Sequence, residues 1–273
     1  MKSREEKLAA FGRILDILDE LRVKCPWDRE QTTESLRPQT IEEVYELSDA
    51  ILKGDDHNIS KELGDVLLHV LFYAKIGEEK GTYDIVDVIN FLCDKLIYRH
   101  PHVFSSTEVA DSAEVVKNWE MLKMKEKDGN KRVLSGVPDT LPPLLKAYRM
   151  QDKARGVGFD WEEKSQVWDK VKEELREYQA ELDAMEKAQD GESRKAAYDR
   201  AENELGDYLF AVVNAARLYG LNPDTALERT CAKFKRRFTY LEEHTIRQGR
   251  SLKDMTLAEM DELWDEAKAK EKE

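Results

Sequence analysis

The chain carries one pattern of acidic residues twice. In each copy a Glu-x-x-Glu pair is followed by a Glu-x-x-Asp pair, after a spacer long enough for a turn between two helices. The residues are Glu43, Glu46, Glu62 and Asp65 in the first copy and Glu174, Glu177, Glu204 and Asp207 in the second. Because three residues advance an α-helix by about 300°, both acids of a pair stand on one stripe, one turn apart. The pattern therefore predicts four carboxylates at one edge of a helix pair.

Such a cluster of carboxylates is typical of a site for a hard cation. Two bare carboxylates about 4 Å apart repel by roughly 4 kcal/mol at an effective dielectric constant of about 20, unless a cation lies between them. Oxygen ligands, with no Cys or His at matching spacing, favour Mg²⁺ or Mn²⁺ over zinc. Acidic runs on helices are also common as solvated faces with Lys or Arg four residues on. The recurrence of the two-part pattern in both halves favours the metal site.

Long helices are needed to position these acids. Apolar residues recur at helical spacing beside them, from Val44 to Leu52 and from Leu63 to Ala74, so the acids flank the seam between two packed helices. Gly and Pro are sparse, at 13 and 7 of 273 residues, and 37% of the residues are charged. This composition favours an all-α protein, and the length is sufficient for two domains that each bury a core.

Glycine and proline interrupt the helical pattern near the middle of the chain. The interruption runs from Asp128 to Pro143, as expected of a connection between domains. We therefore predict an N-terminal domain at residues 1–128, a linker at residues 129–143 and a C-terminal domain at residues 144–273.

The repeat extends beyond the acids to five landmarks in a constant order. In the first half they are Trp27, Glu-Glu-x-x-Glu, Glu-Leu-Gly-Asp, Lys95-x-x-x-Arg99 and Trp119-x-x-x-Lys123. In the second half they are Trp161, the same motif with Glu173 and Glu174, Glu-Leu-Gly-Asp, Lys233-x-x-x-Arg237 and Trp264-x-x-x-Lys268. The offset grows from 131 residues at the first acids to 145 at the last tryptophan, which changes in loop length explain. The halves are predicted to be two related domains.

The second half combines the acids with cations and an aromatic ring. Lys233 and Arg237 stand one turn apart and can face one anionic ligand, although they can equally form a salt-bridged surface. Trp264 offers a plane on which a base can stack, a contact typically worth ~1–3 kcal/mol. A nucleotide polyphosphate needs all three features, and no Gly-x-x-x-x-Gly-Lys phosphate loop is present in the sequence.

Net charge limits the class of partner, and the cysteine content indicates the cellular compartment. A formal net charge of -13, without a broad basic stripe, argues against polymeric nucleic acid as a partner. Cys25, Cys93 and Cys231 lack the spacing of metal ligands and are odd in number, which indicates a reducing cytoplasm. No 18 apolar residues run together, so neither export nor membrane insertion is expected.

Four further segments, together with the acidic pairs, resemble the MazG family of nucleoside triphosphate pyrophosphohydrolases in its two-copy bacterial form. The segments are Cys25-Pro-Trp-Asp28, Arg99-His-Pro-His-Val-Phe104, Val157-Gly-Phe-Asp-Trp161 and Lys233-Phe-Lys-Arg-Arg-Phe238. The resemblance covers nearly the whole chain. It implies a four-helix-bundle-type fold and a homodimer. It also implies Mg²⁺-dependent cleavage of (deoxy)nucleoside triphosphates to monophosphate and pyrophosphate, which would remove unwanted nucleotides from the cellular pool.

The resemblance also implies roles for individual residues of the second copy. The metal ligands are expected to be Glu174, Glu177, Glu204 and Asp207, with Glu43, Glu46, Glu62 and Asp65 as a second metal site. The nucleotide is expected to contact Lys170, Val171, Lys172, Glu173, Glu174, Arg200, Ala201, Glu202, Asn203, Lys233, Phe234, Lys235, Arg236, Arg237, Trp264 and Lys268. The catalytic residues are expected to be Glu173, Glu174, Lys233 and Arg237. Which carboxylate accepts the proton of the attacking water stays open, and Glu173 is a candidate because it lies next to the ligands but not on their helix stripe.

The first copy lacks two cations of the second. Lys170 corresponds to Gln39 and Arg200 to Asn58, so we interpret the first copy as degenerate, regulatory or dimer-building. In the second copy Mg²⁺ is expected to bind the α and β phosphates and to activate the attacking water, while Lys and Arg stabilise the leaving pyrophosphate.

Other hypotheses stay open. A hydrolase of a signalling nucleotide such as guanosine tetraphosphate would use the same residues, and a non-catalytic scaffold would bind only a structural cation. A di-iron bundle would need Glu-x-x-His on two helices, which neither copy supplies. The sequence leaves undecided the base preference, the physiological substrate, the number of metal ions and whether the first copy binds nucleotide.

Two smaller motifs give local expectations. His69 is expected to be a satisfied helix histidine, with an outer-shell contact to the metal site as the alternative. Cys25-Pro26-Trp27-Asp28 is expected to form a rigid turn in which Trp27 is buried and Asp28 caps a helix, with a position bordering the pocket of the first copy as the alternative.

Overall fold

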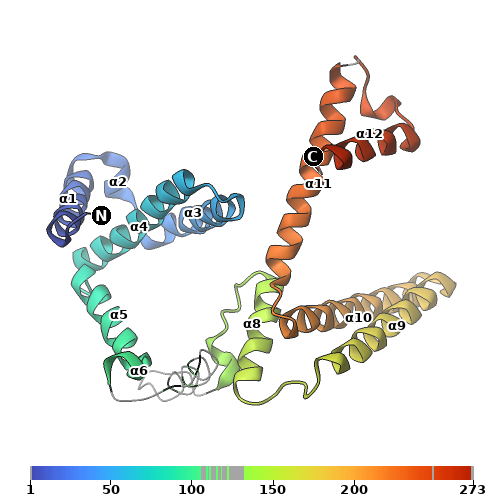
Figure 1. Cartoon of the computed structure of the whole chain (residues 1–273), viewed down its shortest axis with the longest axis horizontal. Helices are drawn as coiled ribbons and strands as arrows, with labels where there is room; N and C mark the ends of the chain where they lie inside the picture. The colour runs from blue at the N-terminus through green and yellow to red at the C-terminus, as the bar shows by residue number, and fades with distance from the viewer. Residues whose placement is uncertain are drawn as a thin grey trace. The chain divides into compact units, whose positions relative to one another are not determined.

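The computed structural model describes residues 2–105, 109, 111, 115, 118, 122, 132–247 and 249–271. Every regular element in this part of the chain is a helix (Figure 1), which confirms the all-α prediction. The landmarks Trp119 and Lys123, and residues 129–131 of the predicted linker, lie outside the described residues. None of the described helices is both long enough and apolar enough to cross a membrane.

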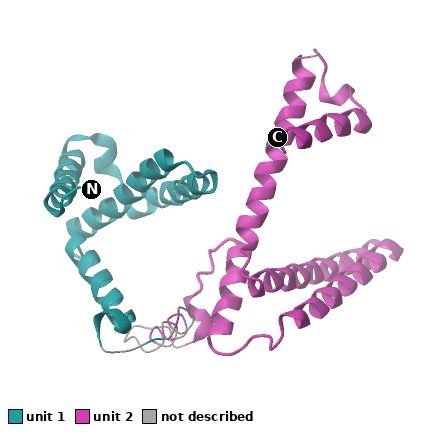
Figure 2. Cartoon of the chain, in the orientation of Figure 1, with its two compact units in different colours: residues 1–110 teal, residues 111–273 magenta. Residues whose placement is uncertain are grey.

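The chain divides into two compact units, residues 1–110 and residues 111–273 (Figure 2). The first unit contains α1 (Arg4–Lys24), α2 (Pro26–Glu30), α3 (Thr33–Lys53), α4 (Asp56–Glu79), α5 (Ile85–Arg99) and α6 (Pro101–Phe104). The second unit contains η1 (Val133–Gly136), α8 (Pro143–Gly156), η2 (Lys164–Gln166), α9 (Val167–Lys187), α10 (Gly191–Leu218), α11 (Pro223–Arg247), η3 (Leu252–Asp254) and α12 (Leu257–Lys270). The linker predicted at residues 129–143 stays a prediction.

The first unit is built on a hairpin of α3 and α4. Thr32 begins α3 by accepting a hydrogen bond from the Ser35 backbone N–H at 3.1 Å, and Gly54 ends it with a left-handed φ of 66°. Asp55 then begins α4 by accepting from the Asn58 N–H at 3.1 Å. Because the connection is so short, the two helices fold back side by side and bring their acidic pairs together.

The second unit repeats this hairpin with α9 and α10. Asp190 begins α10 by accepting a hydrogen bond from the Ser193 backbone N–H at 2.8 Å. The helices pack through small and branched side chains, among them the buried Val167, Val171, Ala211 and Ala215. Helix α8 packs beside α10, and α12 packs on α11 (Figure 1).

Of the two local expectations, one is confirmed and one is wrong. His69 is buried, and its Nδ1 lies 2.9 Å from the Thr40 hydroxyl, so it is a satisfied helix histidine. Trp27 belongs to the short helix α2 and is 53% exposed instead of buried. The Asp28 side chain caps nothing, and its backbone carbonyl accepts a hydrogen bond from Arg22. Arg22 holds the segment through its backbone, which leaves Trp27 free to face outward.

Candidate active site

The hairpin of α9 and α10 brings the second-copy acids together. Carboxylate oxygens of Glu174, Glu204 and Asp207 lie within 4.8 Å of one another. A second set with the same spacing consists of Glu173, Glu174 and Glu177, so Glu174 belongs to both. Glu174 is also the buried member, at 7% exposure, while Glu177 and Asp207 are exposed. The four acids predicted to bind metal therefore meet at one edge of the hairpin, with Glu174 at their centre.

Lys170 lies against this cluster. Its Nζ is 2.6 Å from Glu174 Oε1 and 2.9 Å from Glu173 Oε1. The hydrogen bonds that Lys170 donates to Glu174 and Glu173 raise the pKa of its ammonium group above the usual value. Lys170 thus supplies one positive charge to a cluster of several negative ones, at the position where the sequence predicts a contact with the nucleotide.

The electrostatics of the remaining acids favour an additional cation. Desolvation is the largest cause that raises the pKa of Glu204, followed by repulsion from Glu177, Asp207 and Glu174. A carboxyl group with a raised pKa holds its proton more strongly than it would in water, because its ionised form lacks compensation. A divalent cation would supply that compensation, and the donor set consists of oxygen atoms only.

The first copy repeats the acidic cluster. Carboxylate oxygens of Glu43, Glu62 and Asp65 lie within 4.8 Å of one another, while Glu46 is not part of this set. Desolvation, and then repulsion from Asp65, Glu46 and Glu62, raises the pKa of Glu43. A groove of about 580 Å³ adjoins this cluster, and the lysine that lines it, Lys53, is bound to Asp49 at 2.5 Å.

The predicted cations of α11 form a separate cluster with α12. Arg237 donates to Glu271 Oε2 from Nε at 3.0 Å and lies over the Trp264 ring at 5.7 Å. Phe234 also contacts Trp264, with ring centroids 5.1 Å apart. Among the described residues, no hydrogen bond, ion pair or ring contact joins α11 or α12 to the acids of α9 and α10. The structure thus brings Arg237 and Trp264 together, but it does not bring them to the acids of the same chain.

The other residues predicted to contact the nucleotide have local partners or face solvent. Arg200 donates to Glu181 at 2.8 Å, Lys172 pairs with Asp169 at 3.4 Å, and Lys268 pairs with Asp265 at 2.9 Å. Arg236 donates to Glu271 at 3.2 Å. Val171 and Ala201 are buried, Glu202, Asn203 and Lys235 are exposed, and Lys233 is half-buried.

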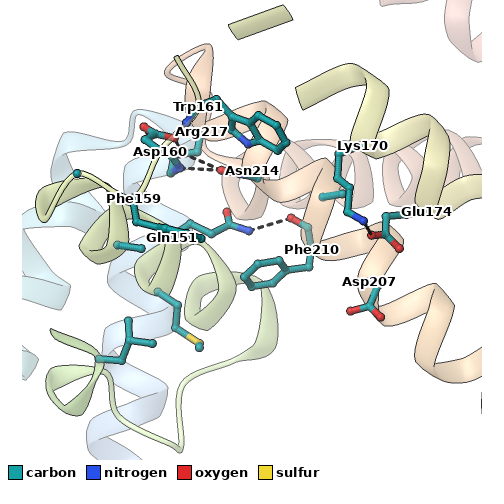
Figure 3. A pocket seen from close by; sticks show the side chains of 15 residues that line it. Gln151, Phe159, Asp160, Trp161, Lys170, Glu174, Asp207, Phe210, Asn214 and Arg217 are labelled. Atoms are coloured by element: carbon teal, nitrogen blue, oxygen red, sulfur yellow. Dashed lines mark hydrogen bonds and ion pairs between the residues drawn. The ribbon is translucent and has the colours of Figure 1, made fainter. Parts of the chain in front are cut away.

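A cavity of about 770 Å³ opens beside the second-copy acids (Figure 3). Lys170, Glu174 and Asp207 lie at one end, whereas Gln151, Trp161 and Arg217 lie at the other. The wall between them is mostly apolar, and the remaining lining residues are Leu134, Met150, Ala154, Gly158, Phe159, Asp160, Phe210, Ala211 and Asn214. The volume lies in the range of roughly 300–1,000 Å³ typical of pockets for small ligands.

An ion pair closes the end of the cavity that is distant from the acids. Arg217 donates to both carboxylate oxygens of Asp160, at 2.5 and 3.1 Å, and to Asn214 Oδ1 at 2.8 Å. Burial opposes ionisation of Asp160, but the hydrogen bonds from Arg217 and from the Trp161 backbone N–H outweigh it and lower the pKa of Asp160. The pair fixes the loop that follows α8 against α10 and thereby holds Trp161 at the cavity.

Sequence reasoning missed Gln151, Asn214 and Arg217 of this wall, which come from two helices without diagnostic spacing. Gly158, Phe159, Asp160 and Trp161 lie in the segment Val157-Gly-Phe-Asp-Trp161, which carried the resemblance but was given no role in the site. Asn214 was the available signal, because it interrupts the apolar run of α10 at a position that the helical period places toward the packed side.

Comparison with known proteins relates both halves to one domain family. The model of the MazG nucleotide pyrophosphohydrolase domain matches residues 31–104 and again residues 162–241, together more than half of the chain. Each match contains one complete set of the four acids, which confirms that the two halves are related.

Relatives match over nearly the full length. The nucleoside triphosphate pyrophosphohydrolase of Escherichia coli (strain K12) is 38% identical over 96% of this chain and 98% of its own length. The nucleoside triphosphate pyrophosphohydrolase/pyrophosphatase MazG of Thermotoga maritima is 40% identical over 94% of this chain and 95% of its own length. The protein YabN of Bacillus subtilis is 46% identical over 98% of this chain, which corresponds to 54% of YabN.

Proposed function

Since the chain belongs to the MazG nucleotide pyrophosphohydrolase family, we propose that it cleaves nucleoside triphosphates between the α and β phosphates. The products are the nucleoside monophosphate and pyrophosphate, the reaction depends on Mg²⁺ or Mn²⁺, and the role is removal of unwanted nucleotides from the cytoplasmic pool. The family and the relatives' names support an enzyme of the nucleoside triphosphate pyrophosphohydrolase class.

One observation carries the assignment of the site. The carboxylates of Glu174, Glu204 and Asp207 converge within 4.8 Å, and Lys170, Glu174 and Asp207 line a cavity of suitable size. A triphosphate ester is an anion attached to a largely apolar group, so it needs charge compensation at one end and an apolar wall at the other. The cavity of the second unit offers both the charged end and the apolar wall.

The residues present fit a divalent cation. Glu174, Glu177, Glu204 and Asp207 would hold it, because they supply only oxygen ligands and because desolvation, followed by repulsion from the neighbouring acids, raises the pKa of Glu204. When bound, Mg²⁺ supplies neutralisation of phosphate oxygens and acidification of a water molecule. Glu43, Glu62 and Asp65 of the first copy offer a similar set, without a lysine at the position of Lys170.

Lys170 and Glu173 have roles that follow from their contacts. A lysine side chain is a flexible point charge, so Lys170 can leave Glu174 and contact a phosphate oxygen once a divalent cation neutralises the acids. That exchange would release Glu173 as well, since Lys170 binds both carboxylates. Glu173 lies beside the cluster and is half exposed, which suits a general base that accepts a proton from the attacking water.

A homodimer would bring the α11–α12 cluster to the acids. Each unit contributes one hairpin of two long helices, and the same unit of a second chain would complete a bundle of four. Large apolar side chains that are mostly exposed within one chain, among them Phe91 on α5 and Phe234 on α11, would be covered by a partner. In that arrangement Lys233 and Arg237 of one chain can contact the phosphates held by the other.

The test is the identity of the products. The full chain is incubated with each dNTP and Mg²⁺, and the nucleotides are separated by anion-exchange chromatography. We expect monophosphate and pyrophosphate, with no product when EDTA replaces Mg²⁺. Diphosphate and orthophosphate would contradict the bond assignment, whereas stabilisation by Mg²⁺ without any product would indicate a metal-binding scaffold.

A further inference from the structure

The α11–α12 cluster contains an acid to which the proposed reaction gives no role. Glu271, the residue that follows α12, binds Arg237, which the proposed homodimer brings to the phosphates. We propose that Glu271 is a positioning residue, which holds the Arg237 guanidinium against Trp264 in the orientation that contacts the leaving pyrophosphate. This inference deepens the proposed function and rests on it, because it assumes that Arg237 contacts a phosphate group.

Glu271 accepts hydrogen bonds from two neighbouring arginines. Its Oε2 atom accepts from Arg237 Nε at 3.0 Å and from Arg237 Nη2 at 2.5 Å. Its Oε1 atom accepts from Arg236 Nη2 at 3.2 Å. The hydrogen bond from Arg237 is the largest cause that lowers the pKa of Glu271, so the carboxylate is ionised at neutral pH. One carboxylate thus compensates two guanidinium groups that would otherwise repel each other.

Trp264 restrains the same guanidinium from a second direction. The Arg237 Cζ atom lies 5.7 Å from the centroid of the Trp264 ring, and this ring packs against Phe234. Trp264 and Glu271 lie about two turns apart on one face of α12, with the buried Ala267 between them. The Arg237 side chain is therefore only 16% exposed although it is charged.

These contacts leave one edge of Arg237 available to a ligand. Nε and Nη2 both donate to Glu271, whereas Nη1 donates no hydrogen bond within the part of the chain that the structure describes. The planar guanidinium recognises a phosphate by its geometry, so its orientation decides the strength of the contact. A side chain that is already held loses less conformational entropy when the phosphate arrives. Lys233 lies one turn earlier on α11 and supplies a second cation beside this edge.

The opposite role, competition with the phosphate, predicts an effect of opposite sign. If Glu271 only blocked Arg237, a phosphate would have to displace it, and removal of its negative charge would strengthen phosphate binding. If Glu271 positions Arg237, removal of its charge weakens the phosphate contact even though the cluster becomes more positive. The sign of the change therefore separates the two roles.

Steady-state kinetics of the full chain with a dNTP and Mg²⁺ test the positioning role. Glu271→Gln should lower kcat by about fivefold, because a hydrogen bond to a charged group is about twice as strong as a neutral one. KM should stay near the wild-type value, since the affected contact forms as the pyrophosphate leaves. Glu266→Gln is the matched control on α12, because this carboxylate accepts from the Tyr240 hydroxyl at 3.2 Å, and it should leave kcat unchanged.

A double-variant cycle tests whether Glu271 acts through Arg237. In an Arg237→Gln background, Glu271→Gln should have little further effect on kcat. A higher kcat/KM in Glu271→Gln, a kcat like that of Glu266→Gln, or additive losses in the double variant would each refute the proposal. Hydrogen exchange shows whether α12 stays packed on α11. If Glu271→Gln loosens α12, Glu271→Asp replaces it in the cycle and should show a smaller loss that also disappears without Arg237.

Pyrophosphate binding distinguishes this inference from the proposed function. Isothermal titration calorimetry measures the affinity of the full chain for pyrophosphate with Mg²⁺, and Glu271→Gln should weaken it by about fivefold. If this weakening is found but no dNTP is hydrolysed, the proposed reaction fails and the positioning role stands. If pyrophosphate is released from a dNTP but neither kcat nor pyrophosphate affinity changes in Glu271→Gln, the reaction stands and the positioning role is wrong. If the wild-type chain neither hydrolyses a dNTP nor binds pyrophosphate, both are wrong.

Discussion

The two copies share their acids but differ in the helix face beside them. Helices α4 and α10 align at an offset of 142 residues, set by Glu62 and Glu204. At this offset three large residues of the first copy, His69, Phe72 and Tyr73, correspond to Ala211, Asn214 and Ala215 in the second. The first copy therefore has bulk where the second has small or polar side chains.

In the first unit this bulk is used for packing. Phe72 is 3% exposed and belongs to a core cluster with Leu18, Leu36, Leu71 and Ile76. The Thr40 hydroxyl lies 2.6 Å from the Tyr73 hydroxyl and 2.9 Å from His69 Nδ1, so these polar atoms satisfy one another.

In the second unit the corresponding positions leave a cavity. Val171 replaces Thr40 at the offset of 131 residues that relates α3 to α9, and Ala211 lines the open space. Lys170 stands beside the acids where the first copy has Gln39. The comparison teaches that similar acidic clusters can stand in different surroundings: Lys170 and the adjoining cavity distinguish the second copy from the first.

The largest expected difference between the copies concerns turnover. Glu174→Gln should lower kcat/KM for a dNTP by more than about 100-fold, since partners outside the metal's ligand sphere alone account for roughly 10- to 100-fold. Glu43→Gln is the matched change in the first copy and should leave kcat/KM near the wild-type value. Steady-state pyrophosphate release measures both. Equal losses in the two variants would show that the first copy also hydrolyses or that it controls the second.

Periodicity and spacing predicted the helices and the acids well, because both depend on local sequence. A Glu-x-x-Glu pair lies on one helix stripe whatever surrounds it, so Glu174 and Glu204 could be placed from the sequence alone. The structure also confirms that short connections fold each helix pair back on itself, which the spacers indicated.

The cavity could not be predicted in the same way. Its wall combines Gln151 of α8, Asp160 of the following loop and Arg217 of α10, which meet only through tertiary packing. No spacing rule links a residue at 151 to one at 214, and the volume depends on which side chains are small. In the proposed homodimer, the approach of α11 and α12 to the acids would also depend on contacts between chains, which the spacing of residues within one chain does not specify.

The second difference concerns the ion pair that a buried arginine forms in each unit. In the second unit Arg217 on α10 binds Asp160, whose side chain is 21% exposed, whereas in the first unit Arg22 on α1 binds Glu79, which is 40% exposed. Breaking a buried pair by removing one partner typically costs about 3–5 kcal/mol, because the other charge stays unpaired. Arg217→Met should therefore destabilise the second unit by a few kcal/mol, at roughly the low end of that range because Asp160 retains some solvent.

Hydrogen exchange resolves this effect for each unit separately. Protection of α8 and α10 should fall in Arg217→Met, while protection of α3 and α4 should not change. Adding Asp160→Asn should restore part of the loss, since it removes the unpaired charge. If the double variant is no more stable than Arg217→Met alone, the arginine acts through packing and not through its charge.

The smallest expected effect concerns the raised carboxyl pKa that both acidic clusters share. Without divalent cations, desolvation and then repulsion from neighbouring acids raise the pKa of both Glu43 and Glu204 above the unfolded value of about 4.5. A carboxyl with a raised folded pKa contributes stability below its unfolded pKa and loses it as the pH rises through the folded pKa. In EDTA, Glu43→Gln and Glu204→Gln should therefore match the wild-type Tm at pH 4 and exceed it by about 1 °C at pH 7.

Glu259 provides a control of opposite sign. The Thr256 backbone N–H, and then Arg250, lower the pKa of Glu259 to about 2. Its contribution is present above the unfolded pKa of about 4.5 and is lost as the pH falls toward 2, so Glu259→Gln should lower Tm at pH 7 and match wild type near pH 2. Differential scanning fluorimetry across pH 2–8 measures all three variants. A Tm gap for Glu43→Gln or Glu204→Gln that does not change with pH would mean that the acids are already compensated, and the electrostatic argument for a cation in both copies would fail.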